Sequence, residues 1–209
     1  LVCAAGADLA AILNTIGTDG TRLGDELEHI RYAGTMNPGS IVPHEYIELH
    51  IEQGPVLEAE QFQCGAVENL QGISWQEITV TGTANHAGTT PTRMRHDAGY
   101  IAASVITYLR HLAMQSDTLT TVGTIRFEPD AINVIPGKAT FTIDMRNPSE
   151  MQLQAAEHKL KAFLLTMTER EGVEISSRQL VRFEPVKFSE DIVNQIAASA
   201  ERLGMTCRR

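Results

Sequence analysis

Hydrophobic and polar positions in the middle of the chain switch between two periods, which predicts strands and helices in turn. Residues 96–113 carry apolar side chains at helical spacing, whereas Trp75–Thr81 has the β-branched and aromatic content of a strand. Pro148–Glu150 is a start signal for a second helix, and Gly172 is its stop. The predicted strands are 75–81, 120–127, 138–146 and 173–181, and the predicted helices are 96–113 and 149–171.

The order of these elements predicts a known arrangement. A β-α-β-β-α-β sequence is typical of a split βαβ domain, in which two helices cover one face of a four-stranded sheet. We expect this module to span residues 73–183. The flanking pieces, 1–72 and 184–209, then belong to a second α/β domain into which the module is inserted. The predicted fold class is therefore α/β (α+β).

The flanking sequence predicts one further strand and several helices. Tyr46–Gln53 alternates apolar and polar side chains, which is the periodicity of a strand with His50 on its polar side. Gly54–Pro55 ends this strand, and Pro55 suits the first position of a short helix. Helical patterns are predicted at 8–16, 21–31 and 191–203.

Composition narrows the class of partner. The chain has 209 residues, 43% of them hydrophobic, which is enough to bury a substantial core. A formal net charge of −9 and the lack of a Lys/Arg cluster argue against binding to nucleic acid or an anionic membrane. No apolar run approaches the roughly 20 residues that span a bilayer. We expect a small-molecule partner and, because the sequence lacks an initiator Met, an internal piece of a longer chain.

The three cysteines indicate a reducing setting. Cys3, Cys64 and Cys207 are odd in number, far apart and outside any CxxC spacing. Neither a disulfide framework nor a thiolate zinc site is therefore expected. A cytoplasmic location fits this composition.

His50 is a candidate metal ligand. His44 and His50 do not form a zinc motif together, because six positions on a strand separate them by about 20 Å, whereas zinc–nitrogen bonds are about 2 Å long. A metal-binding role is favoured by the position of His50 near a strand end. The alternative is a half-exposed histidine without a ligand.

His86 is a candidate catalytic residue in a loop of small residues. Its ring could donate a hydrogen bond to a carbonyl oxygen that gains negative charge, and Ala87 and Gly88 would let a substrate approach. The alternative is an exposed histidine in a turn between Asn85 and Gly88.

Asn133 and Arg146 are candidate substrate contacts. An arginine fork binds a carboxylate with two hydrogen bonds, and an asparagine can donate to and accept from an amide or ureido group. Alternatively, Asn133–Gly137 is only a turn, and Arg146 pairs with Asp144 or Glu128 on a solvated face.

Several motifs in the same order resemble one family over nearly the whole chain. The sequence is similar to the hydantoinase/carbamoylase branch of the M20-type amidohydrolases, which includes N-carbamoyl-L-amino acid hydrolases, β-ureidopropionase and allantoate amidohydrolase. The motifs are Glu48–Glu58, Gln71–Trp75, Asn85–Pro91, Arg95–Ala98, Asn133–Gly137 and Phe141–Arg146.

The resemblance implies roles for the candidate residues. His50 would bind one of two divalent metal ions, zinc or manganese, that activate a water molecule for attack on the carbamoyl carbon. Gln53, Asn133 and Arg146 would contact a small ureido acid. The module at 73–183 would be a lid that forms a homodimer, and its His86 would reach the substrate in the partner's site.

Departures from the family pattern limit these expectations. The family's upstream His-x-Asp segment, its Glu-Glu pair and its last histidine ligand have no counterparts in this sequence. We therefore expect an incomplete metal site and no turnover from these 209 residues alone. Trp75 stands where allantoate amidohydrolases tend to carry arginine, which favours a carbamoyl amino acid over allantoate. The alternatives are an allantoate amidohydrolase, an M20 aminoacylase or peptidase, or a module that only dimerises.

Overall fold

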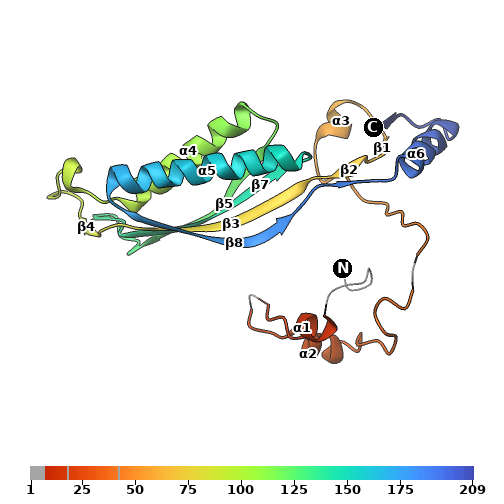
Figure 1. The fold of residues 1–209 in the computed structure, drawn as a ribbon, viewed down its shortest axis with the longest axis horizontal. Helices are drawn as coiled ribbons and strands as arrows, with labels where there is room; N and C mark the ends of the chain where they lie inside the picture. The colour runs from red at the N-terminus through yellow and green to blue at the C-terminus, as the bar shows by residue number, and fades with distance from the viewer. Residues whose placement is uncertain (1–7, 18, 42) are drawn as a thin grey trace. The chain divides into compact units, whose positions relative to one another are not determined.

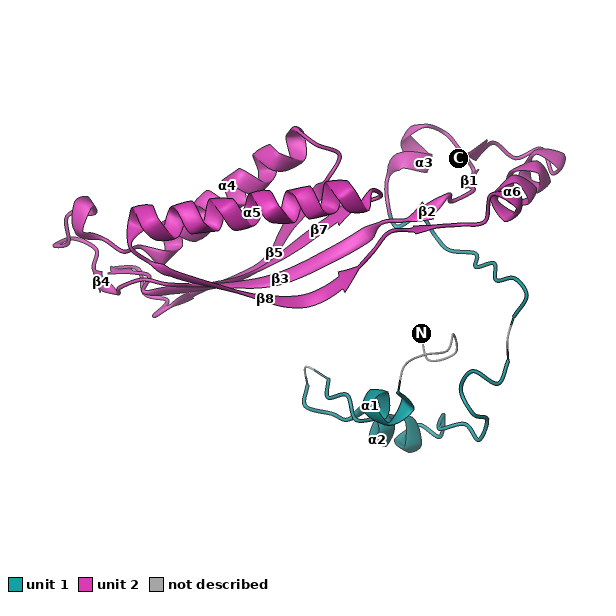
Figure 2. Ribbon diagram, viewed as in Figure 1, with its two compact units in different colours: residues 1–53 teal, residues 54–209 magenta. Residues whose placement is uncertain are grey.

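The chain forms two compact units, residues 1–53 and residues 54–209 (Figure 2). The computed structural model describes residues 8–17, 19–41 and 43–209. Cys3 lies outside the described residues.

The first unit contains two short helices, α1 (Leu9–Leu13) and α2 (Leu23–His29). These helices confirm the patterns at 8–16 and 21–31, although both are shorter than the patterns. Asp8 caps α1, because its carboxylate accepts a hydrogen bond of 2.9 Å from the Ala10 amide. The two helices contact each other, and neither contains a buried residue.

The strand predicted at 46–53 is wrong. The chain is irregular between residues 43 and 53, where the structure assigns no strand. Leu49 is 101% exposed and Ile51 is 77% exposed, although both were expected on a buried face. An alternating pattern forms a strand only where a neighbouring strand supplies hydrogen bonds and a core covers the apolar side. Neither is described for this segment.

The second unit is built on a four-stranded antiparallel sheet in the order β5-β7-β3-β8 (Figure 1). Two helices cover one face of this sheet (Figure 1). This arrangement confirms the β-α-β-β-α-β prediction. The strands are β3 (Gly72–Thr81), β5 (Leu119–Glu128), β7 (Lys138–Asn147) and β8 (Glu174–Phe183), and the helices are α4 (Ala98–Met114) and α5 (Glu150–Glu171).

The helix ends follow from local chemistry. Asp97 caps α4 by accepting hydrogen bonds from the amides of Gly99 at 2.8 Å and Tyr100 at 3.0 Å. Gly172 ends α5 with a φ of 63°, a left-handed conformation that suits glycine. The predicted stop at Gly172 is therefore confirmed.

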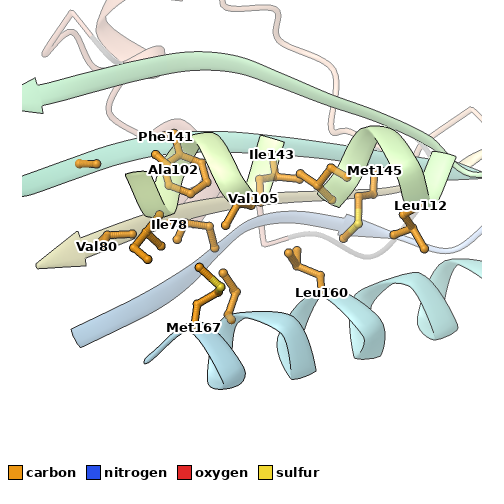
Figure 3. Close-up of a cluster of buried hydrophobic side chains, with 14 of the residues drawn as sticks. Ile78, Val80, Ala102, Val105, Leu112, Phe141, Ile143, Met145, Leu160 and Met167 are labelled. Carbon is orange, nitrogen blue, oxygen red and sulfur yellow. The ribbon is translucent and has the colours of Figure 1, made fainter. Parts of the chain in front are cut away.

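The core lies between the sheet and these two helices. Every second residue of β7 is buried, from Ala139 to Asn147, because alternate side chains of a strand point to opposite faces. Figure 3 shows side chains from the sheet and from both helices filling this layer. The most deeply buried large residues include Ile78, Ile101, Phe141, Ile143, Met145, Leu153, Leu160 and Met167. The opposite face of the sheet carries the half-buried residues of β7, including Asp144 and Arg146.

Short elements surround this module. Two of them join segments that are distant in sequence: β1 pairs in parallel with β10, and β2 pairs antiparallel with β9. Cys64 and Cys207 are partners in the first pair, although they are far apart in the sequence. Both cysteines are free. Among the described helices, none is long and apolar enough to cross a membrane. The short elements are α3 (Val56–Ala59), β1 (Cys64–Gly65), β2 (Asn69–Leu70), β4 (Asn85–His86), a 3-10 turn (Thr92–Met94), β6 (Val134–Ile135), β9 (Val186–Lys187), α6 (Glu190–Arg202) and β10 (Cys207–Arg208).

Candidate functional site

His86 and Asn133 meet at one end of the sheet. The two-residue strands β4 and β6 pair antiparallel, so that His86 is opposite Val134, the residue after Asn133. The Ala87 amide donates a 2.9 Å hydrogen bond to the carbonyl oxygen of Asn133. Both His86 and Asn133 are exposed. Two candidate residues that are far apart in sequence therefore lie at one exposed tip, which we call the His86 tip (residues 85–90 and 133–135).

The tautomer of His86 follows from one contact. The Gly88 amide lies 3.1 Å from Nδ1 of His86, and a backbone amide can only donate. Nδ1 is therefore the acceptor, and in the neutral ring the proton is on Nε2. Nε2–H is then the ring's hydrogen-bond donor, which is what stabilisation of a substrate carbonyl oxygen requires.

Arg95 binds the backbone of the His86 tip, and the next two residues anchor the segment that carries Arg95. Arg95 donates to the carbonyl oxygens of Ala87 at 2.8 Å and Thr90 at 2.9 Å. His96 places Nδ1 2.8 Å from the carbonyl oxygen of Glu171 at the end of α5. Asp97 caps α4, as described above. This segment was part of the family motif, but sequence reasoning gave these residues no role.

Two glycines allow backbone segments to approach each other closely near the tip. A Cβ at Gly82 would lie 2.0 Å from the carbonyl oxygen of His96, and a Cβ at Gly137 would lie 2.7 Å from the amide nitrogen of Ala84. Any other residue at these two positions would displace the backbone. Close backbone contacts therefore help to hold the segments next to the tip.

Arg146 lies near the opposite end of β7 from the His86 tip. Strand β7 begins at Lys138, three residues after Ile135 of the tip. Arg146 is eight positions after Lys138 along this extended strand, which corresponds to roughly 27 Å. A small ureido acid is much shorter than this distance. One small ligand therefore cannot contact both Arg146 and the tip of the same chain.

The side chain of Arg146 forms an ion pair with Asp144. Nη2 of Arg146 lies 2.8 Å from Oδ2 of Asp144, and this hydrogen bond raises the pKa of the guanidinium. This contact is the alternative that the sequence left open. The hydrogen bonds of this pair come from Nε and Nη2, so Nη1 is left as a donor for a second carboxylate. Trp75 is opposite Asp144 on β3, and it is 39% exposed.

His50 and Gln53 lie in the irregular segment of the first unit and are exposed. Nδ1 of His50 is 2.5 Å from the carbonyl oxygen of its neighbour Ile51. Within residues 8–17, 19–41 and 43–209, no group of three or more His, Cys, Asp or Glu side chains could hold a metal ion. The donor set in these residues therefore does not fit the two-ion site expected from the family.

A cavity of about 360 Å³ lies at β9 and the start of α6. Glu68, Lys187 and Phe188 contribute to its lining, and no candidate residue does.

Comparison with known proteins places this geometry in a family. Residues 69–171 match the peptidase dimerisation domain of M20 type. The match spans the sheet up to β7, both helices and the His86 tip.

This part of the chain is an M20 dimerisation domain. The similarity continues outside it. The chain is 38% identical over 188 residues to an N-carbamoyl-L-amino-acid amidohydrolase of Rhizobium meliloti, covering 89% of this chain and 45% of the relative. It is 31% identical over 175 residues to allantoate deiminase 1 of Glycine max, covering 74% of this chain and 36% of the relative.

A solved structure shows the same relation. A hydantoinase/carbamoylase family amidase from Burkholderia multivorans matches with a TM-score of 0.85 and 36% identity, over 96% of this chain and 49% of that chain. The resemblance to the hydantoinase/carbamoylase branch of the M20 amidohydrolases is thus confirmed. The chain spans about half the length of these relatives.

Proposed function

We propose that the chain is part of a metal-dependent amidohydrolase that cleaves the linear C–N amide bond of N-carbamoyl-L-amino acids or related ureido acids. The observation that carries this proposal is the meeting of His86 and Asn133 at one tip of an M20 dimerisation domain. The named relatives that resemble it include N-carbamoyl-L-amino-acid amidohydrolases.

The tip supplies groups that recognise a ureido unit. Nε2–H of His86 would donate to the carbonyl oxygen as it gains negative charge during attack by water, so the contact strengthens in the transition state. The amide of Asn133 would donate to and accept from the same ureido group. The backbone pairing of β4 with β6 holds the two residues together before substrate binds.

Arg146 would bind the carboxylate of the amino acid. Its guanidinium pairs with Asp144 through Nε and Nη2, so Nη1 would be the donor to the substrate carboxylate. Trp75 lies on the same face of the sheet and cannot form the ion pair that an arginine would form at this position, which favours a carbamoyl amino acid over allantoate. Gln53 stays a predicted substrate contact.

The distance along β7 means that Arg146 and the His86 tip of one chain would contact two different substrate molecules. Because roughly 27 Å separates Arg146 from the tip, a single active site would combine Arg146 of one chain with His86 and Asn133 of another. We therefore propose a homodimer in which each lid reaches the partner's site. The outer strand β5 supports this, because its free edge carries unpaired backbone groups and its side chains are mostly exposed.

The metal and the cellular location stay predictions. Two divalent ions, zinc or manganese, are expected in the full-length enzyme, with His50 as one ligand. The M20 amidohydrolases are generally dependent on divalent metal ions, but the residues described in this chain do not assemble such a site. The assignment of residues 1–72 and 184–209 to a catalytic domain, and a cytoplasmic setting, are likewise expectations.

Subunit mixing of the full-length enzyme tests the division of the site. His86→Ala and Arg146→Ala homodimers should each hydrolyse N-carbamoyl-L-amino acids poorly. When the two variants are mixed and allowed to exchange, half of the dimers contain one intact site, so roughly a quarter of the sites become active. Allantoate and N-carbamoyl-β-alanine serve as comparison substrates.

Two results would contradict the proposal. Full activity of the Arg146→Ala homodimer would refute the proposal that Arg146 binds the substrate carboxylate. Failure of the mixed sample to gain activity, with exchange confirmed by a tagged subunit, would show that the tip and Arg146 do not serve different subunits' sites.

A further inference from the structure

A single guanidinium closes the turn that carries His86. Arg95 is half-buried and donates through Nη2 to the carbonyl oxygen of Ala87 and through Nε to that of Thr90. The turn is also closed from within, because the Thr90 amide donates to the carbonyl oxygen of His86 at 3.2 Å. The backbone from His86 to Thr90 is thus held by these three hydrogen bonds.

Gly88 lies between the two carbonyl groups that Arg95 holds. Its amide is the donor to Nδ1 of His86, so the position of this donor depends on the same turn. The ring also lies close to Gly88: a Cβ at this position would be 3.2 Å from Cε1 of His86. A displacement of the turn would therefore break the contact that fixes the tautomer.

The backbone that carries Arg95 is held by contacts of the next two residues. The next residue, His96, contacts the carbonyl oxygen of Glu171 at the end of α5, and its own carbonyl oxygen accepts from the Thr83 amide at 2.9 Å. Asp97 then caps α4. The backbone that carries Arg95 is therefore tied to both helices and to the segment after β3.

From these contacts we infer that Arg95 is a positioning residue that keeps His86 in its Nε2–H tautomer through the Gly88 amide. The importance of this for catalysis rests on the proposed role of His86. The tautomer itself does not, since it is a property of the 209-residue chain. Without Arg95 the Gly88 amide is no longer held against Nδ1, and the proton is free to occupy either ring nitrogen.

The tautomer can be measured directly by NMR. In the ¹⁵N-labelled chain, long-range ¹H–¹⁵N spectra at a pH well above the titration range of histidine distinguish a protonated from an unprotonated ring nitrogen. The signals of His86 are assigned among the seven histidines by their loss in His86→Ala. We expect Nδ1 of His86 to be unprotonated and Nε2 to be protonated in the wild-type chain.

Arg95→Met should move both ¹⁵N shifts of His86 toward each other, as the two tautomers become mixed. Arg95→Lys retains the charge but not the planar fork, so it should give an intermediate change. Arg93→Met is the matched control, because Arg93 is an exposed arginine in the neighbouring 3-10 turn. The control should leave the shifts of His86 unchanged.

The backbone amide signals of β3 and β7 establish whether each variant is folded, and Arg95→Lys replaces Arg95→Met if the latter is not. Unchanged His86 shifts in a folded Arg95 variant would overturn the inference, and so would an equal change in Arg93→Met. Failure of the proposed function looks different: His86→Ala would then hydrolyse substrate normally in the full-length enzyme, while the tautomer would still respond to Arg95.

Discussion

Replacing Arg182 of β8 by methionine should destabilise the fold, because it removes the ion pairs that join β8 to α5. Nε of Arg182 lies 3.0 Å from Oε1 of Glu157, and Nη1 lies 3.2 Å from Oε2 of Glu150. The three side chains are only 21% to 29% exposed. Methionine retains part of the apolar stem, so the substitution removes mainly the contacts of the guanidinium.

The expected loss follows from this partial exposure. A hydrogen bond to a charged group contributes about 1.5–3 kcal/mol when it is protected from water, whereas an exposed ion pair contributes about 0–1 kcal/mol. Arg182 lies between these limits and serves two carboxylates. We expect Arg182→Met to lower the free energy of unfolding by about 2–3 kcal/mol at neutral pH.

Arg178 provides the matched control on the same strand. It pairs with Glu77 at 2.9 Å, but its side chain is 70% exposed. Solvent screens such a pair, so Arg178→Met should cost about 0.5 kcal/mol or less. Urea unfolding followed by fluorescence of Trp75, the single tryptophan, reports on this sheet. Equal losses for the two variants, or no loss for Arg182→Met, would refute the reasoning from exposure.

The same ion pair predicts a pH dependence. The hydrogen bond from Arg182 lowers the pKa of Glu150 below its ordinary value of 4.5. A carboxyl group with a lowered pKa in the folded state stabilises the fold above its unfolded pKa, and this contribution is lost as pH falls through the folded pKa. The difference in stability between wild type and Arg182→Met should therefore be complete at pH above about 5 and shrink below about 4.5.

Three further predictions concern helix caps, metal and assembly. Asp97→Ala removes two short cap bonds and should cost about 1–2 kcal/mol in thermal unfolding, whereas Ser149→Ala removes one bond of 3.5 Å and should cost a few tenths; the reverse order would contradict the cap geometry. The 209-residue chain, dialysed against zinc or manganese, should retain neither ion stoichiometrically by elemental analysis and should not hydrolyse N-carbamoyl-L-amino acids; tight binding with turnover would disprove this. Helix α4 contacts the edge strand β5, so Ile106→Glu on the exposed side of α4 should shift the chain toward monomer in sedimentation, while Leu165→Glu on α5 should not. An unchanged dimer in both variants would exclude the edge formed by β5 and α4 as the dimer interface.

The central fold was predictable because its elements are long and their hydrophobic periods are clear. Helix α5 has a readable start and a glycine stop, and β7 alternates over ten residues. The segment 46–53 shows the limit of this reasoning. Its alternation is as regular as that of β7, but no neighbouring strand is described for it, and pairing is a tertiary property that the period does not contain.

The candidate site was predictable only in part. His86 and Asn133 were singled out separately by their chemistry, and the pairing of β4 with β6 that joins them is too short to leave a hydrophobic period. The cap by Asp97 could have been read from its position before an apolar helical pattern. The role of Arg95 could not, because its acceptors are backbone carbonyl groups, and these are the same for every residue type.

The construction of the tip bears on how the proposed site, divided over roughly 27 Å, could keep its geometry. Close backbone contacts at Gly82 and Gly137, together with the segment 95–97, connect the tip to the sheet and the helices. Hydrogen bonds and close backbone contacts position atoms more narrowly than apolar contacts between flexible side chains do. A substitution that leaves the core intact but adds a Cβ at Gly137 should therefore disturb His86 more than Arg146, since Arg146 is fixed by its own strand and by Asp144.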